Sequence, residues 1–197
     1  LVPIKHSTQD DRIEIRLAGE GGQGMILAGI ILAEAAAVYD GKNAIQTQTY
    51  GPEARGGASK SEVIISQGEI DYPKVISPDV LVVMSQEACD KYIASLKKGG
   101  LLVVDEEKVK RVPTTRAFKV PITRLAVEAT GKALTANVVA LGVLVGLANI
   151  VSREAIEKAV AARAPHGTED MNRAALEAGF AAAEKLAGPR PGAGLSA

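Results

Sequence analysis

The chain has 197 residues, a length that suits one ordinary domain with a full hydrophobic core. Hydrophobic residues make up 47% of it, but aromatic residues only 3% and tryptophan none, so Ala, Val, Leu and Ile must build the core. That composition favours an α/β layered protein over a β-sandwich. With 23 basic and 23 acidic residues the formal charge is zero, so no net field attracts nucleic acid or a membrane surface, and neither partner is expected.

A single cysteine, Cys89, limits the redox chemistry that the chain can support. One thiol forms no intrachain disulfide and no four-thiolate cluster site, and in its predicted helix we expect it to be buried and unreactive. The two histidines, His6 and His166, are too far apart in the sequence to indicate a metal site. The start, LVPIKHSTQDDR, lacks the apolar core of a signal peptide and the apolar runs are short. We therefore expect a soluble cytoplasmic protein.

The first two thirds of the sequence alternate predicted strands and helices. A strand over 12–18 leads into a glycine loop and an apolar helix from Met25 to Tyr39, which Gly41 can end. The turn QGEIDYP after residue 66 looks like a hairpin into a short return strand. The remaining elements expected here are strands over 43–49, 59–66, 78–85, 101–107 and 116–122, and an amphipathic helix over 86–100. This alternation predicts a layered α/β domain with a mostly parallel sheet.

From Pro121 onward the pattern is helical. Ser152 and Thr168 are N-cap candidates, because acidic residues follow each of them in the first turn. Apolar residues recur at three- and four-residue steps in four segments, 122–131, 134–150, 152–164 and 168–188. We expect a single domain over 1–187 that includes a flexible start at 1–11, followed by a disordered tail over 188–197.

The helix predicted around residues 136–149 has almost no polar face. Such a helix must be covered on all sides, either by this domain or by another chain. Asn137 lies within it, and a buried amide requires hydrogen-bonding partners. We favour a cap or core contact for Asn137 over contact with a ligand.

The stretch LAGEGGQGMILAGIILAEAA, residues 17–36, contains the spacing G-x-G-x-x-G of dinucleotide-binding loops at Gly19, Gly21 and Gly24. It follows a predicted strand and opens a helix, where backbone N–H groups can bind an anion. An NAD site also needs an Asp or Glu at the end of the second strand, and that strand ends QTQTYG without one. The signature is incomplete, and a stand-alone NAD- or flavin-binding Rossmann-like oxidoreductase stays an alternative.

A second glycine-rich loop, TYGPEARGGASK, spans residues 49–60. Pro52 fixes its backbone, its glycines permit unusual conformations, and Arg55 and Lys60 supply cations. A solvent-exposed loop in which Arg55 merely pairs with Glu53 is the plainer interpretation. Because both glycine loops follow strands, we expect them to lie together at the carboxyl ends of a parallel sheet, where α/β proteins bind ligands.

Taken together, GEGGQG opening a helix and QTYGPEARGG some 25 residues later resemble the gamma subunit, or gamma domain, of 2-oxoacid:ferredoxin oxidoreductases. The likeness continues through SEVIIS, IDYP, PDVLVVMSQEACDKY, GGLLVVD and TANVVALGVLVGL, and covers roughly residues 12–186. Within the family, GKNAIQTQTYGPEARGGASKSEVIIS is most similar to the members that act on 2-oxoglutarate. The resemblance implies a three-layer α/β/α fold with a mostly parallel sheet and a helical C-terminal part, like domain III of pyruvate:ferredoxin oxidoreductase.

The resemblance also implies a place in a larger enzyme. Enzymes of this family decarboxylate a 2-oxoacid on thiamine diphosphate, pass electrons through iron–sulfur clusters to ferredoxin, and transfer the acyl group to coenzyme A. Thiamine diphosphate, Mg and the clusters belong to alpha, beta or delta subunits. This chain is therefore expected to bind no cofactor alone, to be inactive alone, to assemble with those subunits, and to contact coenzyme A. An isolated homodimer and a purely structural interaction subunit remain alternatives.

No catalytic residue and no metal ligand is assigned to this chain. Arg55 is expected to bind a phosphate or carboxylate, because a guanidinium can hold such an anion with two hydrogen bonds. Gln23 and Glu53 are expected to orient neighbouring groups. The full set of expected ligand and interface residues is Gly19, Gly21, Gly22, Gln23, Gly24, Tyr50, Gly51, Glu53, Arg55, Gly56 and Gly57.

Substituting Arg55 by Ala should lower turnover of the complex at limiting coenzyme A, because the anion loses its cationic partner. The melting temperature of the isolated subunit should stay nearly unchanged. Steady-state kinetics across coenzyme A concentrations checks this, and unaltered kinetics would remove Arg55 from the site.

Overall fold

The computed structural model describes residues 12–49, 57–114 and 116–187. The predictions of a flexible start and a disordered tail lie outside the described residues. Six strands form one sheet in the order β2-β3-β1-β4-β5-β6. Their bounds are β1 (Ile13–Glu20), β2 (Asn43–Thr49), β3 (Ala58–Ser66), β4 (Val80–Val83), β5 (Leu101–Asp105) and β6 (Ala117–Val120).

The described part of the chain contains six α-helices and three short helical turns of the 3-10 or π type. They are α1 (Met25–Glu34) continued by the π-helical η1 (Ala35–Tyr39), α2 (Gln86–Tyr92) with η2 (Ile93–Ser95), α3 (Ile122–Thr130), η3 (Ala133–Thr135), α4 (Ala136–Ala148), α5 (Arg153–Arg163) and α6 (Glu169–Ala187). Among the described residues, no helix combines the length and the hydropathy that a membrane span needs.

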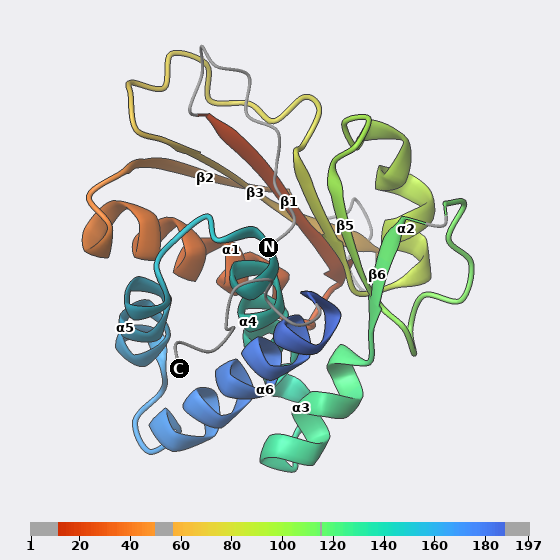
Figure 1. Ribbon diagram of the computed structural model, residues 1–197, viewed down its shortest axis with the longest axis vertical. Helices are drawn as coiled ribbons and strands as arrows, with labels where there is room; N and C mark the ends of the chain where they lie inside the picture. Colours follow the sequence, from red (N-terminus) through yellow and green to blue (C-terminus); the bar gives the residue numbers. More distant parts are fainter. Residues whose placement is uncertain (1–11, 50–56, 115, 188–197) are drawn as a thin grey trace, which may run out of the picture.

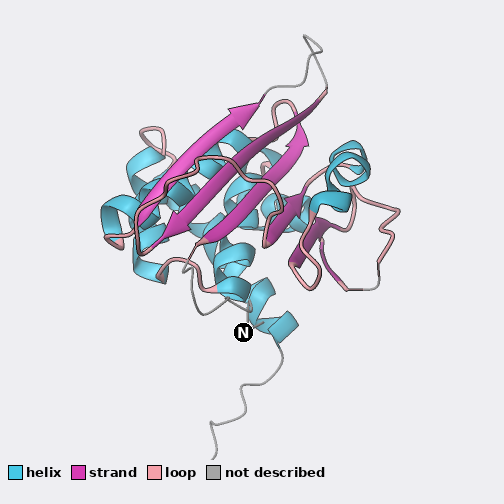
Figure 2. Ribbon diagram, turned by 90° about the horizontal axis from the view of Figure 1, so that it is seen from above, coloured by secondary structure: helices cyan, strands magenta, loops and turns pink. Residues whose placement is uncertain are grey.

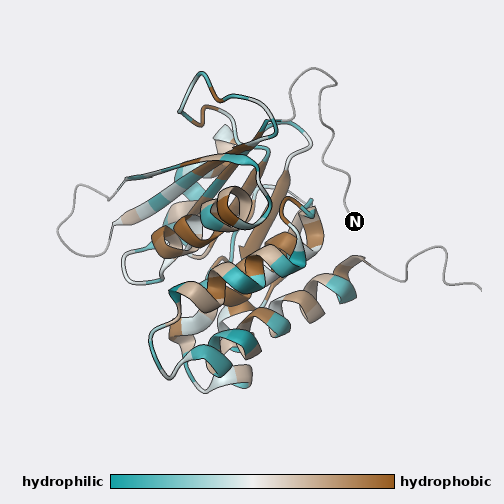
Figure 3. Ribbon diagram, turned by 90° about the vertical axis from the view of Figure 1, so that its left-hand side faces the viewer, coloured by the Kyte–Doolittle hydropathy of each residue, from teal (hydrophilic) through white to brown (hydrophobic). Residues whose placement is uncertain are grey.

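The sheet separates two helical layers of unequal size (Figure 1). Along β1, Ile15 and Leu17 face a large core shared with α1, α3, α4, α5 and α6. The alternate residue Ala18 faces a smaller core that contains Ala88 and Cys89 of α2. Figure 3 shows the hydrophobic segments concentrated between the strands and the large helical layer. The predicted three-layer α/β/α arrangement is confirmed.

The sheet is mixed, as two kinds of pairing show. β1, β4, β5 and β6 pair in parallel, whereas β3 is antiparallel to both β1 and β2. The second glycine-rich loop therefore connects two antiparallel strands as the tip of a hairpin, and it does not lead from a strand into a helix.

The return strand expected after QGEIDYP is wrong, because residues 67–79 contain no strand in the structure. Both sides of β3 are already paired, with β1 and with β2, so β3 has no free edge for the return strand of a hairpin. The segment instead crosses the α2 face of the sheet. Arg12 holds it there by donating to the carbonyls of Tyr72 (2.7 Å) and Lys74 (3.0 Å), and Arg16 donates to that of Val75 (3.2 Å).

The helices begin and end close to the predicted residues, with one exception. The helix predicted over 86–100 ends at Tyr92 and continues only as the 3-10 turn η2, because the turn that contains Gly99 must return the chain to β5. Ser152 caps α5 as predicted, since its hydroxyl accepts a hydrogen bond from the Ala155 amide. Thr168 precedes α6, and its carbonyl accepts from the Asn172 amide.

Helix α4 is covered on all sides by this domain, and no second chain is needed to bury it. Eleven of its thirteen residues are buried. Its closest neighbour is α6, and the contact depends on glycine: a Cβ atom at Gly142 would lie 2.4 Å from the Leu176 carbonyl oxygen, and one at Gly179 would lie 2.3 Å from that of Val139. The two backbones can approach this closely only without side chains at those positions.

The end of η1 is tied to α5 through one carboxylate. Asp40 accepts hydrogen bonds from the Ser152 amide (2.8 Å), the Ser152 hydroxyl (2.7 Å) and the Lys42 ammonium (3.2 Å). Burial raises the pKa of Asp40, but these hydrogen bonds outweigh it, so the pKa lies below its ordinary value near 3.8. Ionised Asp40 therefore stabilises the folded state.

Substituting Asp40 by Asn should lower the free energy of unfolding at about pH 7 by roughly 1–3 kcal/mol, because a charge-assisted network is lost. A carboxyl with a lowered folded-state pKa contributes stability above its unfolded pKa and loses it as the pH falls through the folded pKa. The difference between D40N and the wild type should therefore shrink at about pH 2.5. Urea unfolding at both pH values measures it, and an equal loss at both would contradict the role given to the ionised carboxylate.

Candidate functional site

The carboxyl ends of β1 and β4 form a topological switch point. The two strands are adjacent and parallel. After β1 the chain enters α1 in the large helical layer, and after β4 it enters α2 on the opposite face. A crevice between neighbouring strands whose connections leave to opposite faces is where open α/β sheets bind ligands. The glycine loop over residues 21–24 lies at this point.

Gln23 fills the switch point with its own side chain. Its amide oxygen accepts a hydrogen bond from the Glu20 amide (2.7 Å), and its amide nitrogen donates to the Met84 carbonyl (2.9 Å) at the end of β4. Gly19 provides the room, since a Cβ atom there would lie 2.3 Å from the Gln23 oxygen. The first glycine of the spacing therefore accommodates a side chain of the same loop.

Gly24 joins the loop to α4. It adopts the left-handed conformation with φ of 73°, and a Cβ atom there would lie 2.7 Å from the amide nitrogen of Asn137. Asn137, only 5% exposed, donates to the Gly24 carbonyl over 3.4 Å. The core contact favoured for this amide is confirmed, and the first turn of α4 fixes the start of α1.

Gly21 and Gly22 are the exposed part of the loop. No described atom would lie within 4 Å of a Cβ at either position. Gly22 has φ of 92°, which disfavours any other residue, whereas no such φ is found at Gly21. Within the described residues, nothing in the chain's own packing requires a glycine at position 21.

Gly57 is the one expected residue of the second loop that the structure describes. Tyr50, Gly51, Glu53, Arg55 and Gly56 lie outside the described residues. Gly57 precedes Ala58, which pairs with Glu20, so the structure places it beside the glycine loop at the carboxyl end of β1. Gly57 and the glycine loop therefore lie at the same edge of the sheet, and Figure 2 shows the arrowheads of β1 and β2 pointing toward it.

Two side chains and one backbone carbonyl also hold this edge together by hydrogen bonds, and the sequence alone did not indicate them. The Ser59 hydroxyl donates to the Gly19 carbonyl (3.2 Å), and the Glu87 carboxylate accepts from the Ala58 amide (3.2 Å). The Met84 carbonyl receives Gln23. The available signal was Glu87 in the first turn of a helix that follows a buried strand, a common position for residues at the carboxyl edge.

The chemistry available in the described part of the chain is limited. No group of three His, Cys, Asp or Glu side chains there could hold a metal ion. Cys89 is fully buried as expected, and burial together with the neighbouring Asp90 raises the pKa of its thiol. A thiol that stays protonated is a poor nucleophile.

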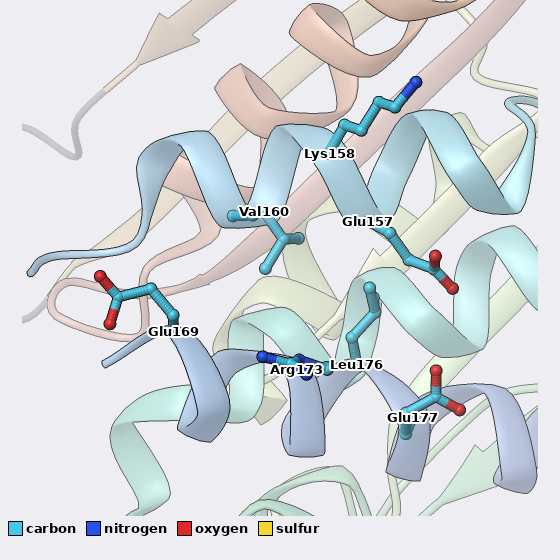
Figure 4. A pocket seen from close by; sticks show the side chains of 8 residues that line it. Glu157, Lys158, Val160, Glu169, Arg173, Leu176 and Glu177 are labelled. Carbon is cyan, nitrogen blue, oxygen red and sulfur yellow. The ribbon is translucent and has the colours of Figure 1, made fainter. Parts of the chain in front are cut away.

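A cavity of about 350 Å³ lies between α5 and α6, away from the residues of the glycine loop (Figure 4). Its lining carboxylates Glu157 and Glu177 point toward the same end of the groove, where Arg153 binds both. Lys158 pairs with Glu154 and Arg173 with Asp170. With these charges already paired, the cavity is a gap between packed helices.

Comparisons with known proteins agree on one family. The sequence model described as pyruvate ferredoxin/flavodoxin oxidoreductase matches residues 14–182. The 2-oxoglutarate synthase subunit KorC of Methanocaldococcus jannaschii is 54% identical over 180 residues, which cover 89% of this chain and 96% of that protein. The chain belongs to the pyruvate ferredoxin/flavodoxin oxidoreductase family. The family assignment made from the two loops is thereby confirmed.

Two solved structures share the fold. The gamma subunit of a keto/oxoacid ferredoxin oxidoreductase from Geobacter sulfurreducens is 51% identical, with a TM-score of 0.80, and the match covers 89% of this chain and 97% of that one. A 2-oxoglutarate:ferredoxin oxidoreductase from Magnetococcus marinus, solved with 2-oxoglutarate, coenzyme A and succinyl-CoA bound, is 25% identical with a TM-score of 0.80. That match covers 92% of this chain and 32% of the longer one.

Within this family fold, the strand order argues against a nicotinamide site. In a dinucleotide-binding fold the second strand lies next to the first, and an acid at its end reaches the ribose. Here antiparallel β3 lies between β1 and β2, so the end of β2 is displaced from β1 by two strand spacings, roughly 9–10 Å. The crevice that would take the pyrophosphate holds Gln23.

Substituting Gln23 by Ala should lower the free energy of unfolding by roughly 1–3 kcal/mol, because the Glu20 amide and the Met84 carbonyl lose their partner. Gln67→Ala, at an exposed glutamine in the turn after β3, is the matched control and should be nearly neutral. Denaturant unfolding of both variants measures the difference. If the two variants are equally stable, Gln23 does not hold the switch point together.

Proposed function

We propose that this chain is the gamma subunit of a 2-oxoglutarate:ferredoxin oxidoreductase. In that reaction 2-oxoglutarate loses CO₂, the remaining acyl group forms a thioester with coenzyme A, and the two electrons released reduce ferredoxin. The observation that carries the proposal is the 54% identity to a 2-oxoglutarate synthase subunit across nearly the whole of both chains. The match covers 89% of this chain and 96% of that subunit, which supports a corresponding place in a corresponding enzyme.

The redox and decarboxylation groups would lie on partner subunits. We assign thiamine diphosphate with Mg and the iron–sulfur clusters to alpha, beta and, where present, delta subunits, with ferredoxin reached through the complex. The chain's single cysteine supports this assignment, because a cluster is held by several thiolates and Cys89 is buried among apolar side chains. A sequence with one unpaired cysteine and no disulfide also suits a cytoplasmic complex.

The contribution of this chain would be an edge of the active site. Gly21 and Gly22 are exposed and have no described neighbour within 4 Å of a Cβ position, so another molecule can approach the backbone there. Coenzyme A carries phosphate groups, and the nearby start of α1 favours negative charge. Arg55 would supply the cation. Gln23 would hold the loop in the conformation that presents these groups.

A purely structural role is the second candidate, and one observation favours it. Because Gln23 already occupies the switch point, a ligand or partner meets only the outer surface of the loop. If alpha and beta subunits without this chain kept full coenzyme A-dependent turnover, the structural role would gain and the coenzyme A role would fail.

The Gly21→Ala variant tests whether the glycine loop contacts a ligand or is only a turn between β1 and α1. The new methyl group meets open space in this chain, so the melting temperature should be unchanged or slightly higher. In the reconstituted complex it should raise the KM for coenzyme A by about tenfold, equivalent to about 1.4 kcal/mol, if the loop contacts that ligand. Ferredoxin reduction at varied coenzyme A measures the effect.

Gly68→Ala is the matched control, because Gly68 is also exposed and its nearest atom to a Cβ would be 3.9 Å away. It should leave KM and stability as they are. A Gly21→Ala complex with wild-type assembly and kinetics would show that neither ligand nor partner approaches the loop. Weaker assembly, with an unchanged KM for coenzyme A in the complexes that do form, would favour the structural role.

A further inference from the structure

The turn before α4 carries the most exposed large apolar side chain in the described part of the chain. Leu134, in η3, is 73% exposed. Its neighbour Thr135 is buried, and the Thr135 hydroxyl donates to the Lys132 carbonyl (3.0 Å) and lies 2.9 Å from the Thr130 hydroxyl. The polar groups of the turn therefore fix its shape, and Leu134 is held on the outside.

A second exposed leucine lies in the first turn of α1. Leu27 is 40% exposed, whereas Met25 and Ala28 of the same turn are buried in the core. Long side chains on a helix lean toward its N-terminus, so Leu27 leans toward the glycine loop from which α1 starts. It therefore adds apolar area next to the exposed backbone of Gly21 and Gly22.

One contact places both leucines at the candidate site. α1 and α4 lie side by side (Figure 1), and at their starts the Asn137 amide donates to the Gly24 carbonyl over 3.4 Å. Residues three apart lie on the same side of a helix, roughly 5–6 Å from each other. Leu134 comes three residues before Asn137, and Leu27 three residues after Gly24, so each leucine lies about one turn from this contact. Both side chains and the bare glycine backbone thus share one edge of the sheet.

We propose that Leu27 and Leu134 contact an apolar surface of a cofactor-bearing subunit, one of those that would hold thiamine diphosphate or the iron–sulfur clusters. The inference rests on the proposed function and identifies the partner surface of that site. Apolar side chains that adjoin open backbone indicate a protein–protein contact. Because the turn that holds Leu134 is already fixed, little conformational entropy is lost when a partner covers it.

A cofactor-bearing subunit suits this surface better than a second copy of the chain. The described residues offer no metal-binding cluster and their cysteine is buried, so a copy would bring no reacting group to the edge. A loop that binds an anion can serve the reaction only where another chain supplies those groups. In the Magnetococcus marinus enzyme the matched region is 32% of one chain, so there the same fold is part of a longer polypeptide.

Assembly of the full chain with the purified cofactor-bearing subunits tests the proposal. Leu134→Glu places an unpaired charge in the contact and should raise the Kd of assembly by at least about tenfold. Leu27→Glu should do the same, and a carboxylate in the first turn of α1 favours the helix. Both side chains are exposed in the isolated chain, so the melting temperatures should change little. Sedimentation velocity measures the Kd.

Val38→Glu is the matched control. Val38 is 66% exposed and lies farther along the same helical segment, in η1, roughly 20 Å from Gly24. The same charge at this position should leave assembly unchanged. If Val38→Glu weakens assembly as much as Leu134→Glu does, the loss comes from the added charge and not from this surface, and the proposal is overturned.

Hydrogen exchange locates the contact without any substitution. The backbone amides of residues 21–27 and 131–135 should exchange more slowly in the assembled complex than in the isolated chain, because the partner excludes water from them. A complex that forms while both segments exchange as in the isolated chain would overturn the proposal.

The remaining outcomes separate this proposal from the proposed function. If both glutamate variants assemble and support turnover like the wild type, the partner surface is wrong and the proposed function stands. If the wild-type chain neither binds the cofactor-bearing subunits nor supports their turnover, both are overturned. A wild-type homodimer that Leu134→Glu breaks and Val38→Glu does not would assign the surface to a second copy and overturn the proposal.

Discussion

The burial of α4 is the constraint on which the rest of the structure depends. A helix without a polar face is stable in water only when it is covered all round, and here the sheet, α1, α3, α5 and α6 cover it. The close α4–α6 contact at Gly142 and Gly179 sets the depth of the helix in that layer. Its first turn is thereby held against the glycine loop, where Asn137 meets Gly24. The geometry of the candidate site is therefore a consequence of core packing.

The packing explains two of the three glycines in the G-x-G-x-x-G spacing. In a dinucleotide site the second glycine lets the backbone approach the pyrophosphate, whereas the first and third serve a tight turn and close helix–strand packing. Here Gly19 makes room for the Gln23 side chain and Gly24 makes room for Asn137. Both contacts are intramolecular, and they rigidify the loop. Only Gly21 and Gly22 remain open to solvent. A loop that is fixed from within and bare on its outer surface suits a site that another chain or ligand completes.

Local pattern predicted most elements and missed those that depend on distant partners. Strand 43–49 and the buried strands followed from periodicity and composition, because alternation and apolar runs are properties of neighbouring residues. The return strand failed because the availability of an edge depends on the whole sheet, and β3 already had two neighbours. The Gln23 contact was equally out of reach, since Met84 lies 61 residues away in the sequence. Neither loop spacing nor helix propensity contains that information.

The β2–β3 hairpin connects the glycine loop to the segment expected to bind the anion. The chain leaves the sheet after Thr49, which pairs with Lys60, and returns at Ala58, which pairs with Glu20 at the end of β1. The Ser59 hydroxyl and the Glu87 carboxylate add hydrogen bonds where the chain returns. The antiparallel β3 therefore has two effects: it moves β2 away from β1, which removes the second strand of a dinucleotide-binding fold, and it brings Gly57 to the edge of the sheet where the glycine loop lies.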